Sequence, residues 1–149
     1  MTDDHARIEL ECERIRAENE KLLEEFAGWL SAKGLGDTTV HRHCKNVEFY
    51  LNYFLLYEDA EEAAEGVSSV SMFLGSWFIR KAMWASRAAI KSNATSLKKF
   101  YTFMHEKGKV STEQLDDLKR DIKEEMPDWL ETMARYDDPN LNADEIWGL

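Results

Sequence analysis

Apolar side chains along this 149-residue chain recur at intervals of three and four positions, with polar and charged residues between them. Such spacing places the apolar residues on one face of an α-helix, because the helix turns once in about 3.6 residues. Glycine and proline, which interrupt helices, occur only seven times and twice. The pattern therefore predicts an all-α protein, a compact bundle of four to six helices with an extended N-terminal helix.

Interruptions of the pattern indicate where the first helices begin and end. A first helix starts near Thr2 or Asp3 and ends at a glycine-containing turn, KGLGD, at 33–37. A second helix starts at Thr38 or Thr39, since threonine is a favourable residue just before a first helical turn.

The apolar pattern in the second half of the chain predicts four further helices. They span about 68–84 and 87–107, then a fifth that starts at Ser111 or Thr112, and a short sixth that starts at Pro127. Proline is tolerated in the first turn of a helix because its missing N–H has no partner there to lose.

A single folded domain is expected, because 149 residues suffice to bury one substantial core. We predict a helical extension over 1–21, the helical domain over 22–136 and an acidic tail over 137–149. No apolar run approaches the roughly 20 residues of a membrane-spanning helix, and the N-terminus lacks the apolar core of a signal peptide. The two cysteines, Cys12 and Cys44, form no CxxC pair. These features favour a cytoplasmic protein without a membrane partner.

The first predicted helix also carries a seven-residue repeat. Ile8, Ile15, Leu22 and Trp29 recur every seven positions, and Asn19 occupies an intervening position at which a buried amide commonly fixes the register of a coiled coil. One interpretation is a homodimer that associates through Ile8, Ile15, Asn19 and Leu22. An amphipathic helix packed on its own domain requires the same pattern over three heptads, so both interpretations stay open.

Charge is distributed unevenly along a chain whose formal net charge is −10. Acids concentrate in 1–30, in a predicted connection at 58–66 and in 110–149, whereas 67–109 hold eight bases and one acid. The overall charge repels a polyanion at long range, but the field within a Debye length, about 8 Å at physiological salt, depends on the local patch. The basic patch is therefore the feature that points to a partner.

Two predicted helices, the second and the fourth, carry basic residues on a face distinct from their apolar one. Guanidinium and ammonium groups on two neighbouring helices bind phosphates by displacing counterions. A solvated helix face explains either stripe alone, but it does not explain a stretch of 43 residues with a single acid. The predicted DNA-binding residues are Thr39, Arg42, Lys45, Arg87, Lys91, Thr95, Lys98 and Lys99.

Motifs of catalysis and of metal binding are missing from the sequence. GxGxxG, GxxxxGK[ST], GxSxG and HExxH do not occur. His41 and Cys44 share a helix face, yet a closed zinc site requires four ligands and no second pair has a matching spacing. We therefore expect a non-enzymatic chain without a metal or another cofactor.

Two segments resemble the N-terminal SAM-like core-binding domain of tyrosine recombinases and phage integrases. The segment FAGWLSAKGLGDTTVHRHCKNVEFYLNYFL, 26–55, has an aromatic helix, a K-G-L turn and a threonine that starts the next helix. The segment SNATSLKKFYTFMHEKGKV, 92–110, has small polar residues, a basic pair and then F-Y-x-F. The resemblance covers about 22–125 and implies a helical half of a clamp around duplex DNA. It assigns DNA contacts to Thr39, Arg42, Lys45, Lys91, Thr95, Lys98 and Lys99.

In that family the catalytic residues belong to a following domain, and this chain ends at Leu149 without them, so the resemblance implies no strand cleavage here. We predict a non-catalytic protein that contacts the phosphate backbone of duplex DNA through its second and fourth helices during integration or recombination. The alternative is a protein-interaction module that self-associates through the heptad helix and binds a partner through its acidic segments.

Overall fold

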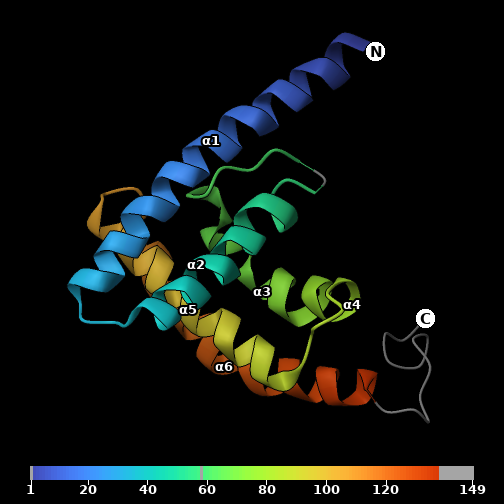
Figure 1. Ribbon diagram of the computed structural model, residues 1–149. Helices are drawn as coiled ribbons and strands as arrows, with labels where there is room; N and C mark the ends of the chain where they lie inside the picture. Colours follow the sequence, from blue (N-terminus) through green and yellow to red (C-terminus); the bar gives the residue numbers. More distant parts are fainter. Residues whose placement is uncertain (1, 58, 138–149) are drawn as a thin grey trace.

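The computed structural model describes residues 2–57 and 59–137, with the backbone alone for Thr2 and Asp3. The predicted acidic tail lies outside the described residues from 138 onward. The described residues form an all-α bundle and contain no β-strand, which confirms the predicted class. The elements in chain order (Figure 1) are α1 (Thr2–Ala32), α2 (Asp37–Phe49), the π-helical turn η1 (Tyr50–Phe54), the 3-10 turn η2 (Glu65–Ser68), α3 (Val70–Met72), the π-helical turn η3 (Phe73–Trp77), α4 (Phe78–Lys81), α5 (Arg87–Glu106) and α6 (Thr112–Tyr136).

The long helix α1 packs on the bundle over little more than its second half. Figure 1 shows its N-terminal end extending past the other helices. Ile8 is 51% exposed, whereas Ile15 is 1% exposed and Phe26 is fully buried. The Phe26 ring meets the Phe100 ring of α5 edge-on, with 5.3 Å between centroids. The packed part of α1 thus begins near Ile15, earlier than the predicted domain boundary at residue 22.

Most of the heptad seam on α1 is occupied within the chain. Ile15 is buried and Leu22 is half-buried against the core. Asn19 is also buried, and its Nδ2 donates a hydrogen bond to Asn52 Oδ1 at 2.9 Å. Ile15 and Asn19 are thus buried within the single chain, and association of two copies through this seam stays a prediction. Of its four residues Ile8 alone is exposed.

A glycine turn connects α1 to α2, as predicted from KGLGD. Gly34 has a φ of 92°, a conformation that side-chain-bearing residues rarely adopt. The N–H of Leu35 donates to the Leu30 carbonyl at 3.3 Å and so satisfies one of the free carbonyls at the helix end. α2 begins at Asp37, one residue before Thr38, which is the first of the two predicted starts. Gly36 supplies the extended residue that precedes the first turn.

The acidic connection after η1 is fixed to the core by two buried tyrosines. Tyr50 donates its hydroxyl hydrogen to the Gly66 carbonyl at 2.6 Å, and Tyr101 donates to the Ala63 carbonyl at 2.8 Å. Burial raises the pKa of both tyrosines well above 10, so both hydroxyls keep the hydrogen that they donate. The connection therefore holds a defined path across the bundle.

The predicted third helix, 68–84, is helical without a gap from Val70 to Lys81, since α3, the π-helical turn η3 and α4 follow one another directly. The π-helical turn η3 contains Gly75, which lies against the Trp129 indole of α6. A Cβ on Gly75 would lie 2.7 Å from the indole nitrogen, closer than atoms pack. The chain thus accommodates a large ring from a distant helix, a contact that local periodicity does not encode.

α6 runs without interruption from Thr112 to Tyr136, so the prediction of a separate sixth helix at Pro127 is wrong. Ser111 caps its start, in agreement with the sequence. Pro127 is exposed, so the carbonyl that loses its helical partner is accessible to water. Trp129 and Met133 are buried and hold the second half of the helix on the bundle. The packing of side chains on both sides of Pro127 outweighs the tendency of proline to interrupt a helix.

Replacing this proline should stabilise the protein. We expect Pro127→Ala to raise the free energy of unfolding by about 1–3 kcal/mol, because it restores one helical hydrogen bond and removes a steric clash. Urea denaturation followed by circular dichroism measures the change. The control is Glu131→Ala, an exposed position of the same helix, which should change the stability by less than about 0.5 kcal/mol. A neutral or destabilising Pro127→Ala would contradict this description of α6.

Candidate nucleic-acid interface

Buried polar side chains join α2 to α5. His43 Nδ1 and Ser96 Oγ lie 2.7 Å apart. Asn46 Nδ2 donates to Ser92 Oγ at 3.1 Å and to Ser96 Oγ at 3.0 Å. Residue 43 thus faces 96 while residue 46 faces 92, so the two helices run antiparallel. This register decides which surface residues of α2 and α5 become neighbours.

The hydrogen bonds of Ser96 assign the proton on His43. Ser96 Oγ donates its single hydrogen to the Ser92 carbonyl at 3.1 Å and accepts one from Asn46. It therefore accepts from His43 as well, which places a hydrogen on Nδ1 of that ring. Burial lowers the pKa of His43, and the charges of two nearby cations lower it further. With His43 neutral, the positive charge of this region belongs to the surface residues.

On the solvent side of this network, α2 and α5 present cations together. Arg42 of α2 and Lys91 and Thr95 of α5 line a shallow pocket of about 340 Å³, with His43 and Ser92 beneath them. The side chains of Arg42, Lys91 and Thr95 are exposed. Residues from two distant segments of the sequence thus share one surface.

The cations of this surface have few acidic neighbours. Within residues 2–57 and 59–137, no ion pair involves Arg42, Arg87, Lys91, Lys98 or Lys99. Lys45 lies 3.7 Å from Glu48, an exposed pair one helical turn apart. Exposed ion pairs of this kind contribute little to stability and break readily, so Lys45 also stays accessible to an anionic ligand.

α6 adds two lysines that the sequence analysis did not select. Lys119 and Lys123 line a pocket of about 510 Å³ together with Lys98 of α5. Their spacing of four residues puts them on one side of a helix, a signal that was present in the sequence. They were overlooked because the surrounding segment is strongly acidic. The basic surface formed by α2, α5 and these two lysines of α6 is called the basic face below.

Three acids of α6 lie on the flank opposite its two lysines. Asp117 and Asp121 pair with Arg120 at 3.0 and 3.4 Å, and Glu125 accepts a hydrogen bond from the Ser71 hydroxyl at 2.9 Å. The three acids follow one another at intervals of four, and each lysine lies two positions after an acid. Two positions correspond to about 200° of rotation around a helix, so the acids occupy the opposite flank. These three acids therefore do not cancel the charge of the basic face, whereas the exposed Asp116, three positions before Lys119 and seven before Lys123, lies on the same flank as the lysines.

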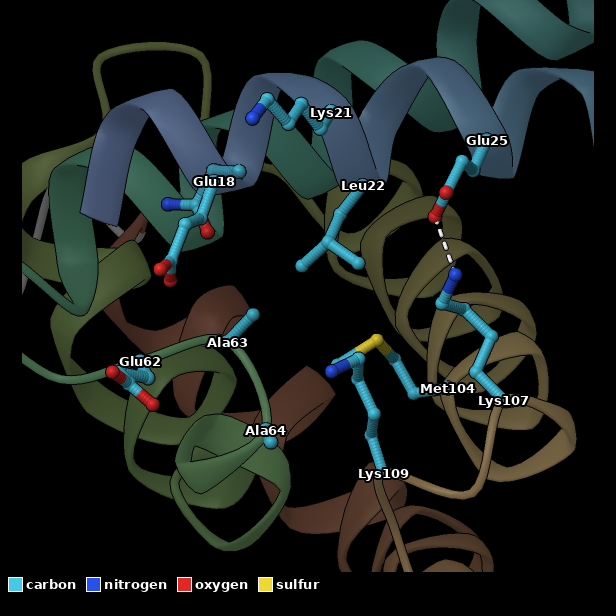
Figure 2. A pocket seen from close by; sticks show the side chains of 11 residues that line it. Glu18, Lys21, Leu22, Glu25, Glu62, Ala63, Ala64, Met104, Lys107 and Lys109 are labelled. Carbon is cyan, nitrogen blue, oxygen red and sulfur yellow. Dashed lines mark hydrogen bonds and ion pairs between the residues drawn. The ribbon is translucent and has the colours of Figure 1, made fainter. Parts of the chain in front are cut away.

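A different charged pocket, of about 460 Å³, lies between α1, the acidic connection and the end of α5 (Figure 2). Its charged lining residues are Glu18, Lys21, Glu25, Glu62, Lys107 and Lys109. Lys107 donates to Glu25 at 2.6 Å, and Arg14 reaches Glu62 from α1 at 2.8 Å. Because acids and bases are equal in number here and partly paired, this pocket suits a polyanion less well than the basic face does.

The eight residues predicted to bind DNA are all exposed or half-buried and belong to α2 and α5. The pocket collects Arg42, Lys91 and Thr95. Toward the C-terminal end of α2 and the start of α5, the exposed residues are Lys45 and Arg87. Toward the other end lie the half-buried Lys98, Lys99 and Thr39. The proximity of Lys99 to α2 is evident from its effect in lowering the pKa of His43.

The described part of the chain contains no group of three or more His, Cys, Asp or Glu side chains that could hold a metal ion. The HRHC segment places His43 in the hydrogen-bonded network, while Cys44 is a half-buried free thiol. None of the helices in that part is both long enough and apolar enough to cross a membrane.

Comparison of the chain with protein-family models, with curated proteins and with solved structures gives no match. The functional interpretation therefore depends on the residues of the chain itself.

Proposed function

We propose that this chain is a non-catalytic DNA-binding protein that contacts the phosphate backbone of duplex DNA through α2 and α5. One observation carries the proposal. Arg42 and Lys91 come from two different helices, line one pocket and have no acidic partner among the described residues. Unpaired cations gathered on one surface bind a polyanion by releasing its counterions.

The dimensions of the basic face fit a nucleic-acid strand. The stripe from Arg87 to Lys98 on α5 is roughly 16 Å long at a rise of 1.5 Å per residue. A DNA strand advances about 3.4 Å per nucleotide, so the stripe spans roughly five phosphates. Packed helices lie about 8–10 Å apart, which places Arg42 and Lys45 in a second row beside the first. Two rows of cations can follow a backbone without reading its sequence.

A role in DNA integration or recombination is part of this proposal. It is supported by the resemblance of 26–55 and 92–110 to the core-binding domain of tyrosine recombinases. The two helices to which that resemblance assigns the DNA contact are the helices that carry the basic face. The proposal assigns binding to this chain and the chemistry of strand exchange to other catalytic residues.

The salt dependence of binding to a generic duplex tests the proposal. With about four phosphates neutralised, the logarithm of the association constant should fall against the logarithm of the salt concentration with a slope near −3.6. Fluorescence anisotropy of a labelled duplex over a salt series measures this slope. Absence of binding at low salt, or a slope shallower than about −1, would contradict the proposal.

A further inference from the structure

One end of the basic face leads to an exposed aromatic cluster. Tyr53 is 61% exposed and Trp84 is 58% exposed. The half-buried Phe49 lies between them, with its ring centroid 5.3 Å from that of Tyr53 and 4.9 Å from that of Trp84. Phe49, Tyr53 and Trp84 together are called the aromatic platform.

The platform is fixed to the core of the bundle. The Phe49 ring lies 6.1 Å from Phe73 and 5.8 Å from Trp77, and the Trp84 ring meets the buried Phe78 edge-on at 6.4 Å. Such contacts hold the exposed rings in position before a ligand arrives. A flat ligand that stacks on them therefore loses little affinity to the ordering of side chains.

The register of α2 and α5 places the platform next to the cations. On α2 and its continuation η1, Lys45 is followed four residues later by Phe49 and eight residues later by Tyr53. In the antiparallel pair, these positions lie beside the start of α5. Trp84 precedes Arg87 by three residues there. A strand bound along Arg87 and Lys91 thus reaches the platform at its end.

The charge beside Trp84 favours an anionic partner such as a nucleic acid. Residues 67–105, which include Trp84, contain no acid, and Lys81 and Arg87 lie three positions to either side of that tryptophan. Aromatic rings within a cationic groove stack nucleobases irrespective of sequence. Bases inside a duplex already stack on both sides, so away from the duplex ends a ring can receive only a base that is unpaired.

We infer that the DNA bound by this chain contains a junction between duplex and unpaired strand, with phosphates on the basic face and an unpaired base stacked on the ring of Trp84 or of Tyr53, which face in different directions. This inference rests on the proposed function and specifies the form of DNA that the same surface selects. The inference gives the exposed rings of the aromatic platform a binding role that a duplex alone would not require.

The test compares three labelled DNAs, namely a blunt duplex, the same duplex with a single-stranded thymine extension, and that duplex with an abasic extension of equal length. The abasic probe keeps the added phosphates and lacks the bases. The wild-type chain should bind the thymine extension at least about fivefold more tightly than the abasic one, in line with the usual effect of one stacked base. Extensions of both polarities are measured.

The variant Trp84→Ala should remove this preference and leave the affinity for the blunt duplex unchanged, whereas Trp84→Phe should keep most of it. The control is Met83→Ala, because Met83 is 98% exposed next to Trp84 and offers no ring. Tyr53→Ala provides an independent variant on the other helix, and thermal melting verifies that each variant is folded.

Two results would overturn the inference and leave the proposed function intact. The first is equal binding of the thymine and abasic extensions by the wild-type chain, which would show that no base stacks on the platform. The second is an equal loss of affinity for all three probes in Trp84→Ala, which would make the ring a structural support. Absence of binding to every probe would instead contradict the proposed function itself.

Discussion

Reversal of three charges on the basic face should lower the affinity for a generic duplex by at least about 100-fold at low salt. The variant replaces Arg42, Lys91 and Lys98 by glutamate. Each substitution removes one phosphate contact and adds one charge that repels the DNA. The three substitutions together should therefore cost the binding free energy of several counterion-release events. Fluorescence anisotropy with the duplex used for the salt series measures the loss, and circular dichroism verifies the fold.

The matched control reverses three exposed cations away from the basic face, Arg7, Lys21 and Arg135. This variant has the same net charge as the first, but its new carboxylates lie on other surfaces and are screened beyond about 8 Å. We expect it to lose less than about tenfold in affinity. Equal losses in the two variants would show that binding follows net charge alone, and the basic face would then have no special role.

Truncation of Phe26 should destabilise the protein by about 3–5 kcal/mol, the usual cost of removing a buried aromatic side chain. The Phe26 ring is fully buried and contacts Phe100 and Phe103 of α5 at centroid distances of 5.3 and 5.6 Å. The Phe26→Ala variant therefore leaves a cavity where α1 meets the bundle. Chemical denaturation measures the free energy of unfolding.

Ile8→Ala is the matched control, because Ile8 belongs to the same heptad pattern and is exposed. It should change the stability of the monomer by less than about 0.5 kcal/mol. A coiled-coil dimer would give a different result, since Ile8→Ala would then lower stability in a manner that depends on protein concentration. That outcome would support the seam on α1 as an interface between copies.

Helix ends that depend on local chemistry were predictable from the sequence. α5 was expected over 87–107 and spans Arg87–Glu106, and the cap at Ser111 is present. These ends are set by a glycine with positive φ, such as Gly108, or by a serine that accepts a backbone hydrogen bond. Both signals lie within a few residues of the boundary.

Features that depend on distant partners were not predictable. The third helix contains a π-helical turn where Gly75 meets Trp129, and Pro127 stays inside α6 because residues on both sides of it are buried. The heptad pattern on α1 was compatible with two arrangements. The hydrogen bond between Asn19 and Asn52, which lie in different helices, shows that Asn19 packs within the chain.

The residues of the basic face on α2 and α5 were predictable from the sequence, but its extension onto α6 was not. Periodicity alone put Arg42 and Lys91 on the outer sides of two helices. Their proximity depends on the buried contact of His43 with Ser96, which fixes the register of α2 and α5. The lysines of α6 belong to the basic face because α6 packs beside α5. This packing could not be predicted from the sequence, and the acids around the two lysines gave no reason to expect a basic surface there.

The most direct test of the central claim is the salt slope of a variant that loses one cation from each helix, Arg42→Gln with Lys91→Gln. If both side chains contact phosphate in the same complex, the slope should be about 1.8 units shallower than that of the wild-type chain, or about 0.9 for each residue. Glutamine is shorter than either side chain but stays polar, and it adds no repulsive charge. An unchanged slope would show that α2 and α5 do not bind the DNA backbone together.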